Sequence, residues 1–560
     1  MKITGAKAVI QSLLNEKVEV IFGYPGGANM PIYDALYDVR DKIRHILVRH
    51  EQGAAHAAEG YARVSGKVGV CFATSGPGAT NLVTGIADAM MDSVPLVCIT
   101  GQVAASLVGT DAFQETDVIG ITTPITKWNY QITSAQEIAE VFAKAFYIAK
   151  TGRPGPVVID IAKNAQFEEV DFSYPKNFSL EKYKNLDKFT VDDLKKAAKL
   201  INSSNKPLLI VGHGVIISQA QDEVLALAKK AHLPIAATLH GLSAISVSFP
   251  LYVGMTGMHG DYAVNKLTNQ ADLIIGCGMR FDDRVTGVLS KYAPKAKIIH
   301  IDIDEAEIDK NVKTTVSLVG DAKKVLSSLL PYVKKNSHQE WFKLFFQLKK
   351  EEKRYHQKRE EKFKNKITMD KVFSVLSKIT DGKAVIVADV GQNQMFAAKY
   401  FNYQTFNSYI SSGGLGTMGY ALPAAIGVKI AKPKELVIAS CGDGGLQMTI
   451  QELGTIMQEK LPVKILLLNN YYLGMVRQWQ DLFFEKRYSF TYMENPNFLK
   501  IAEGYGIKGK RVVELSKLEE ALKEFVNEKE AFLLEVVVEK EHNVFPMVPQ
   551  GAAVDEVRLE

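Results

Sequence analysis

The sequence of 560 residues predicts an α/β protein built from three doubly wound parallel-sheet domains. Short apolar runs rich in β-branched residues alternate with helical patterns, which is typical of strands in sheets that are covered on both faces. Many of these runs end in glycine-rich turns, where open parallel sheets bind ligands. The chain is also too long to form one hydrophobic core, since a domain usually holds about 100–200 residues.

The predicted strands and two interruptions set the domain division. The strands are residues 68–74, 95–100, 156–161, 207–212, 271–278, 297–303, 384–390, 435–440 and 463–470. Residues 166–192 are polar without a clear period and predict a linker. Residues 334–366 are densely charged, but acidic residues intersperse the basic ones, so a solvated helix and linker is favoured over a basic nucleic-acid arm. We therefore expect domains over about 1–170, 190–335 and 365–560.

Composition and charge argue against several classes of protein. Hydrophobic residues make up 47% and charged residues 23%, as in globular proteins, and a net charge of +5 is small for a nucleic-acid binder of this length. No apolar run reaches the roughly 20 residues of a membrane span, and the N-terminus lacks a signal-peptide pattern. Cys71, Cys98, Cys277 and Cys441 have no metal-ligand spacing. We expect buried free thiols in a reducing, cytoplasmic compartment.

The strongest local signal is the turn Gly442-Asp443-Gly444-Gly445 at the end of a predicted strand. Glycines at a strand-to-helix turn let the backbone approach phosphate oxygens, and a helix start favours negative charge. Asp443 is unfavourable beside a diphosphate unless a hard divalent cation lies between them. The next predicted strand ends at Asn470, whose amide oxygen is a second hard ligand. The turn alone would be a plain turn; the combination predicts a metal-bound diphosphate.

This combination of turn, helix, apolar strand and paired asparagines resembles the motif of thiamine-diphosphate enzymes. The resemblance implies thiamine diphosphate and Mg²⁺ as cofactors, with the backbone carbonyl of Tyr472 as a third metal ligand beside Asp443 and Asn470. Alone, Glu51 could be a helix-start acid that the dipole favours. With the motif, the resemblance implies that Glu51 activates the cofactor through its aminopyrimidine ring and that Glu59 is structural.

Longer stretches resemble the catalytic subunit of acetohydroxyacid synthase, also called acetolactate synthase, over nearly the whole chain. They are residues 75–97, 111–117, 124–130, 152–161, 254–260, 280–287, 300–308, 412–427 and 473–480. The family is a transferase that opens branched-chain amino-acid biosynthesis. The resemblance implies decarboxylation of pyruvate and transfer of the two-carbon unit to a second pyruvate or to 2-ketobutyrate, giving 2-acetolactate or 2-aceto-2-hydroxybutyrate. The alternative is a thiamine-dependent pyruvate oxidase or decarboxylase.

The segment RFDDRVTG (280–287) separates this family from that alternative. By itself it could be a surface ion cluster, but in the family it lies beside a bound FAD and the substrate channel. Arg284 would reach the carboxylate of the second keto acid, because a guanidinium binds both oxygens, and Met258 would line the channel. The residues implied at the flavin are Arg153, Gly212, His213, Gly214, Thr238, Leu239, His259, Gly278, Arg280, Asp302, Ile303 and Asp321.

The resemblance also assigns the remaining site residues. Gly26, Gly27, Gln392, Asn393, Gly416 and Met475 would contact the thiamine cofactor. Met418 would hold that cofactor bent, and Trp479 would favour 2-ketobutyrate as acceptor, although an aromatic there is more often core. Phe113, Gln114 and Lys127 would approach from a neighbouring subunit. A homodimer or homotetramer is implied, and the family commonly has a small regulatory subunit.

Three positions depart from the family pattern. Asn393 stands where the family usually has histidine; it keeps a hydrogen-bond donor for diphosphate but cannot carry a charge. Trp128 also replaces a usual histidine, and His213 stands where glycine is common near the flavin. These departures concern local contacts and leave the reaction class unchanged.

Overall fold

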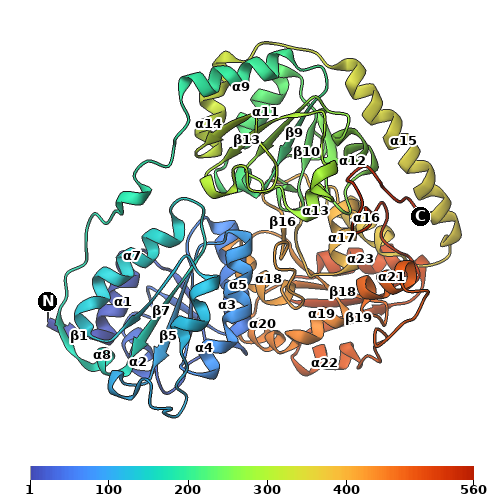
Figure 1. The fold of residues 1–560 in the computed structure, drawn as a ribbon. Helices are drawn as coiled ribbons and strands as arrows, with labels where there is room; N and C mark the ends of the chain where they lie inside the picture. Colours follow the sequence, from blue (N-terminus) through green and yellow to red (C-terminus); the bar gives the residue numbers. More distant parts are fainter. Residues whose placement is uncertain (1) are drawn as a thin grey trace.

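In the computed structural model, which describes residues 2–560, the chain folds into three α/β units, each built on a six-stranded parallel sheet (Figure 1). The predicted fold class is confirmed, and each predicted strand is found. Met1, the first residue of the predicted 1–170 domain, lies outside the described residues. We propose the predicted ranges as domain boundaries, because the strands of each sheet fall inside one of them. No helix among the described residues has the length and apolarity needed to cross a membrane.

The first sheet has the strand order β3-β2-β4-β5-β7-β6. Its strands are β2 (Val20–Gly23), β3 (Arg44–Leu47), β4 (Gly69–Ala73), β5 (Leu96–Gln102), β6 (Trp128–Ile132) and β7 (Pro156–Ala162). Its main helices are α1 (Gly5–Asn15), α2 (Met30–Tyr37), α3 (Glu51–Ser65), α5 (Val83–Asp92) and α7 (Ile138–Lys150). In the predicted linker, a short strand β8 (Glu169–Asp171) pairs antiparallel with β1 (Lys2–Thr4) before the chain leaves this unit.

The central sheet has the order β11-β10-β9-β12-β13-β14. Its strands are β9 (Pro207–Val211), β10 (Ile235–Ala237), β11 (Tyr252–Met255), β12 (Leu273–Cys277), β13 (Lys297–Asp302) and β14 (Val316–Val319). Its helices include α9 (Val191–Ser203), α10 (His213–Ile217), α11 (Gln221–Ala231), α12 (Tyr262–Thr268), α13 (Asp283–Thr286) and α14 (Ala322–Leu329). The charged segment that follows forms the long helix α15 (Gln339–Lys362), which buries only Trp341, Phe342 and Phe345.

The third sheet has the order β16-β15-β17-β18-β20-β19. Its strands are β15 (Val385–Ala388), β16 (Tyr409–Ser411), β17 (Val437–Gly442), β18 (Lys464–Asn469), β19 (Lys508–Val512) and β20 (Phe532–Val537). Its helices include α16 (Met369–Ile379), α17 (Gln392–Tyr400), α18 (Ala421–Ala431), α21 (Gly474–Phe483), α22 (Phe498–Gly504) and α23 (Leu518–Asn527).

The sequence predicted one helix after the glycine turn, and this prediction is wrong. The structure instead has α19 (Asp443–Met448), a 3₁₀ turn (Ile450–Glu452) and α20 (Leu453–Glu459). At the break, the Thr449 hydroxyl donates to the Gly419 carbonyl at 2.8 Å. The Glu452 carboxylate accepts the backbone N–H groups of Arg49 at 3.0 Å and His50 at 3.1 Å. These long-range bonds hold the chain in a conformation that a local helical pattern does not indicate.

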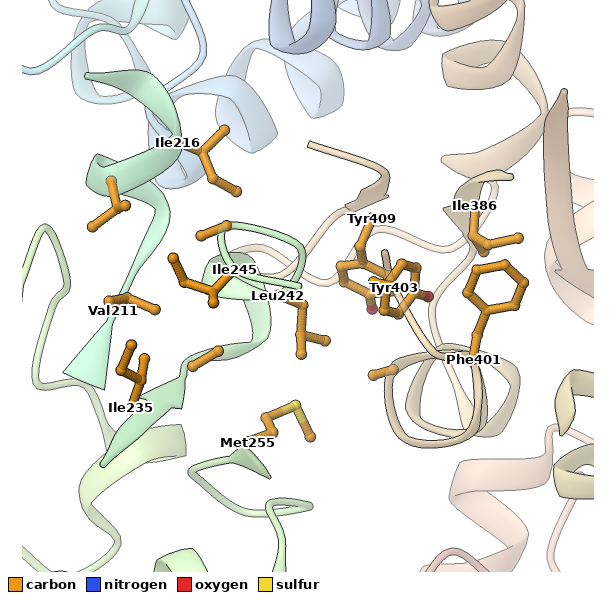
Figure 2. Close-up of a cluster of buried hydrophobic side chains, with 14 of the residues drawn as sticks. Val211, Ile216, Ile235, Leu242, Ile245, Met255, Ile386, Phe401, Tyr403 and Tyr409 are labelled. Carbon is orange, nitrogen blue, oxygen red and sulfur yellow. The ribbon is translucent and has the colours of Figure 1, made fainter. Parts of the chain in front are cut away.

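The central and third units share one apolar core (Figure 2). Leu242 and Met255 of the central unit face Tyr403, Tyr409 and Phe401 of the third, and all five side chains are buried. Burial of apolar surface is worth about 25 cal/mol per Å², so this shared core holds the two sheets in a fixed relation. The space between their strand ends is therefore a defined cleft.

The first and third units meet along helices α3 and α18, which approach closely at two glycines. A β-carbon on Gly60 would lie 2.1 Å from the Ala424 carbonyl oxygen, and one on Gly427 would lie 1.8 Å from the Ala57 oxygen. Both distances are far inside van der Waals contact. The two backbones can pack at this separation only because neither position carries a side chain.

We predict that Gly427→Ala destabilises the protein by about 1–3 kcal/mol, because the new methyl group must push α3 and α18 apart. The measurement is the urea midpoint of unfolding. Gly504→Ala is the control: its β-carbon would meet nothing within 4 Å, so a neutral or slightly stabilising effect is expected there. Equal midpoints for the two variants would contradict the proposed role of the close contact.

Candidate active site

The glycine turn and the paired asparagines lie side by side at the carboxyl edge of the third sheet. Strands β17 and β18 are parallel neighbours, with Gly442 opposite Leu468. Asp443 therefore follows one strand end and Asn470 the next; their exposed fractions are only 2% and 4%. The structure brings the two predicted metal ligands to one place, as expected when a crossover connection joins neighbouring parallel strands.

Asp443 carries a buried carboxylate that a cation would stabilise. Its Oδ2 accepts a hydrogen bond from Asn495 Nδ2 at 2.7 Å, and burial raises its pKa to about 6. Asn470 Oδ1 accepts the Tyr472 N–H at 3.0 Å, and Asn470 Nδ2 donates to Gln392 Oε1 at 3.3 Å. The oxygen donors fit a hard divalent ion such as Mg²⁺. Asn495 was missed from the sequence, because it belongs to a distant loop with no motif of its own.

A small cavity of about 60 Å³ opens beside this turn. Its lining includes the predicted residues Gln392, Asn393, Met418, Gly442, Asp443, Gly444, Gly445, Asn470, Tyr472 and Met475. Gly391 adopts a φ of 130°, a conformation that L side chains rarely take, so the backbone before Gln392 stays open. The Asn393 Oδ1 atom is buried without a hydrogen-bond partner. The open glycine turn leaves room for the oxygens of a diphosphate, whereas the unpaired Asn393 Oδ1 is itself an acceptor and would need a donor.

A larger cavity of about 620 Å³ lies between the central and third units and is also bordered by residues of the first, such as Arg153. Of the predicted flavin, channel and cofactor residues, it is lined by Arg153, His213, Gly214, Thr238, Leu239, Met258, His259, Gly278, Arg280, Arg284, Asp302, Ile303, Asp321, Gly416, Met418, Met475 and Trp479. Met418 and Met475 border both cavities, so the two spaces adjoin. The volume lies in the usual range for ligand and cofactor sites, roughly 300–1,000 Å³.

The polar groups of the larger cavity fit a bound cofactor. His259 Nδ1 is buried without a hydrogen-bond partner, and burial lowers the pKa of His259 to about 4. Burial raises the pKa of Asp302 to about 7. Arg153 contacts Glu307 at 2.8 Å. Gly212 does not line the cavity; its N–H donates to the Cys277 carbonyl at 2.9 Å and joins β9 to β12.

The segment 280–287 forms part of the cavity wall. Asp282 caps α13 by accepting the Val285 N–H at 3.2 Å. This cap directs Arg284 outward, and the Arg284 side chain is 62% exposed. The Arg284 guanidinium lies 3.3 Å from the Met258 sulfur. Trp479 reaches the same cavity from α21. The Arg284 guanidinium, which also lies 3.6 Å from the Asp283 carboxylate, and the Trp479 indole thus border one space.

The other predicted residues are not brought to these cavities within one chain. Gly26, Gly27, Glu51, Phe113, Gln114 and Lys127 line neither of them. Glu51 begins α3 and accepts a hydrogen bond from Asn81 Nδ2 at 2.9 Å, and it is 92% buried. Phe113 is 87% exposed, which is unusual for a large apolar side chain. The expectation that these residues belong to the same site therefore stays a prediction.

Lys127 has a local structural partner. Its ammonium donates to the Ile148 and Thr151 carbonyls at the end of α7, where cations are favourable. Burial lowers the pKa of Lys127 to about 7. Trp128 lies on the edge strand β6, stacked on Tyr130 and under Lys144. Trp128 therefore contacts neither cavity. His213, in contrast, lines the larger cavity, and its Nδ1 lies 3.1 Å from the Asp92 carbonyl oxygen.

All four cysteines are free and buried, as expected from the sequence. Cys71 and Cys98 face each other across β4 and β5, with 3.2 Å between their sulfur atoms. None of the four lines either cavity. We infer that the thiols take no part in the site.

Three family models match successive parts of the chain. They describe the N-terminal TPP binding domain, the central domain and the C-terminal TPP binding domain of thiamine pyrophosphate enzymes, over residues 3–121, 194–329 and 389–536. These matches define this protein as a thiamine pyrophosphate enzyme.

Individual relatives narrow the class. A probable acetolactate synthase large subunit of Methanocaldococcus jannaschii is 46% identical, over 99% of this chain and 95% of the relative. The acetolactate synthase large subunits of Lactococcus lactis and Corynebacterium glutamicum are each 45% identical, over 99% and 100% of this chain and 96% and 90% of their own lengths. The chain belongs to the acetolactate synthase large-subunit family.

We predict that Asp443→Asn stabilises the protein in the absence of metal and cofactor, and abolishes Mg²⁺-dependent binding of thiamine diphosphate. The folded-state pKa lies above the ordinary value of 3.8, so the folded state holds the extra proton and loses stability as pH rises from about 4 to about 6. Removing the charge raises the free energy of unfolding by up to about 3 kcal/mol at pH 8 and by about half of that at pH 5.

Urea unfolding at the two pH values and calorimetric titration with the cofactor measure these effects. Asp34→Asn, on the exposed side of α2, is the control and should change the free energy of unfolding by less than about 0.5 kcal/mol. An Asp443→Asn variant that binds cofactor normally would contradict a metal at this turn.

Proposed function

We propose that this chain is the catalytic subunit of an acetolactate synthase. It decarboxylates pyruvate and transfers the two-carbon unit to a second pyruvate or to 2-ketobutyrate. The observation that carries the proposal is the adjacency of two spaces: a buried metal turn at Asp443 and Asn470, and a large cavity bordered by Arg284 and Trp479. The printed names of the full-length relatives support the same activity.

Asp443, Asn470 and the Tyr472 carbonyl would hold Mg²⁺, and the open glycine turn would receive the diphosphate. Thiamine diphosphate, when bound, supplies a carbanion and an electron sink that side chains lack. FAD would occupy the larger cavity, lined by Arg153, Asp302 and Asp321 among others. Because the reaction transfers no net electrons to a flavin, its role here is structural.

Glu51 would hold and release a proton at the aminopyrimidine ring. Asn81 donates to its carboxylate from 2.9 Å and fixes its orientation. Since Glu51 lines neither cavity of its own chain, it would act on the cofactor held by a second chain. A homodimer or a homotetramer built from such dimers follows, with Phe113 and Gln114 approaching the same site from the Glu51 chain.

The channel residues would select and position the acceptor. Arg284 offers a planar fork that matches a keto-acid carboxylate. Trp479 would favour the longer alkyl chain of 2-ketobutyrate, and Met258 and Met475 would exclude water from the reacting atoms. The relatives are named large subunits, so we also propose a small regulatory partner. A pyruvate oxidase or decarboxylase is not favoured, because the full-length relatives are acetolactate synthases.

The direct test is product formation. We expect the purified chain with pyruvate, thiamine diphosphate, Mg²⁺ and FAD to yield acetolactate. Acetaldehyde as the main product, or peroxide with acetyl phosphate, would identify a different thiamine enzyme. Folded protein with all four components and no turnover would contradict the proposal.

We predict that Glu51→Gln lowers kcat roughly 100- to 10,000-fold, the usual contribution of a positioned acid or base. Glu59→Gln is a matched control on the same helix. Burial raises the pKa of Glu59 well above its usual range, which favours the neutral carboxyl that glutamine resembles in shape, so turnover should change little. Equal losses of kcat in the two variants would mean that any substitution in α3 impairs the enzyme. That result would contradict a specific role of Glu51 in activating the cofactor.

A further inference from the structure

A cluster of histidine and carboxylate side chains lies outside both cavities, where α15 and α16 meet. His356 and Glu360 are one helical turn apart on α15, and Asp370 stands in the first turn of α16. His356 Nε2 lies 3.0 Å from Asp370 Oδ2, and His356 Nδ1 lies 3.6 Å from Glu360 Oε2. One donor atom from each of the three residues lies within 4.8 Å of the others. Such separations suit ligands of a common ion.

A fourth side chain points into the cluster from the C-terminal segment. His542 is 95% buried, and its Nε2 lies 3.7 Å from Asp370 Oδ2, beyond hydrogen-bond range. Its Nδ1 has no hydrogen-bond partner among the described residues. A buried nitrogen without a hydrogen bond is unusual, because an unsatisfied polar group costs about 1–3 kcal/mol. His542 thus faces the Asp370 carboxylate through Nε2, while its other ring nitrogen is unpaired.

Aromatic rings hold both imidazoles in place. His542 stacks on Phe396 with ring centroids 5.2 Å apart, and Phe363 meets it edge-on at 5.2 Å. Tyr400 lies beside His356 at 5.3 Å. Burial lowers the pKa of His542 to about 4. The neighbouring rings fix both imidazoles at the edge of the cluster, and ligands held in place in advance favour metal binding.

We propose that His356, Glu360, Asp370 and His542 form a binding site for a divalent transition-metal ion, for which Zn²⁺ is the best match. Two imidazole nitrogens and two carboxylate oxygens suit Zn²⁺, whereas the Mg²⁺ expected at Asp443 prefers oxygen ligands alone. The two metal sites are therefore chemically distinct. One donor atom each of His356, Glu360 and Asp370 already lies within 4.8 Å of the others, and His542 would move closer to complete the set.

The site would fasten the C-terminal segment to the helix that links the central and third units. Figure 1 shows the chain end beside α15, and the Arg359 guanidinium already donates to the Leu559 carbonyl at 2.9 Å and to the Phe545 carbonyl at 3.4 Å. Farther along, the Val548 N–H donates to the carbonyl of Met258, which lines the larger cavity, at 2.7 Å. A metal bound through His542 would hold this segment against the cavity wall.

The test is Zn²⁺ binding to the full chain saturated with Mg²⁺ and thiamine diphosphate, measured by equilibrium dialysis and metal analysis. We expect about one tightly bound Zn²⁺ per chain, with an X-ray absorption spectrum showing nitrogen and oxygen ligands near 2.0 Å, including imidazole. Zn²⁺ should also slow proteolytic removal of the C-terminal segment. Asp370→Asn and Glu360→Gln should each weaken binding at least about tenfold.

Glu361→Gln is the matched control: it removes the same charge from the same helix, where Glu361 pairs with Lys364 and not with the cluster. It should bind Zn²⁺ like the parent chain. Glu360 is itself 45% exposed, so its variant is expected to fold. No tight Zn²⁺ in the parent chain, or equal binding by the Glu360 and Glu361 variants, would overturn the site and leave the cluster as a set of ion pairs.

Discussion

The close packing of α3 on α18 sets the geometry on which the rest of the site depends. At Gly60 and Gly427 the two backbones touch without intervening side chains, so the first unit has one orientation on the third. The start of α3 meets Glu452, whose carboxylate accepts the N–H groups of Arg49 and His50. Glu51, at the start of the same helix, lines neither cavity of its own chain. This placement supports our proposal that Glu51 acts on the cofactor of another chain.

The second constraint is the buried carboxylate at the end of β17. Burial makes ionised Asp443 unfavourable, although Asn495 donates a side-chain hydrogen bond to its carboxylate. A divalent cation and a diphosphate together would neutralise this position, so binding of the two is expected to be coupled. The core shared by the central and third units keeps the larger cavity open beside it. Met418 and Met475 lie at the junction, where substrate would meet cofactor.

Local patterns allowed much of this to be predicted. Buried parallel strands read as continuous apolar runs, and a crossover between neighbouring strands placed Asp443 beside Asn470 without knowledge of the rest. Three features could not be predicted in this way: the broken helix at Thr449, the hydrogen bond from Asn495, and the position of Glu51 relative to Asp443 of its own chain. Each depends on contacts between residues far apart in the chain. Lys127 shows the same limit, since its partners are backbone carbonyls, which no residue pattern marks.

The most direct test of an active site shared between two chains is complementation between two inactive variants. Glu51→Gln and Asp443→Asn chains would be unfolded, mixed in equal amounts, refolded together with thiamine diphosphate, Mg²⁺ and FAD, and assayed for acetolactate. Half of the dimers would then be mixed, each with one intact site, so about a quarter of the parent activity is expected. Activity no greater than that of the separate variants would contradict a shared site and would place Glu51 and Asp443 in the same chain's centre.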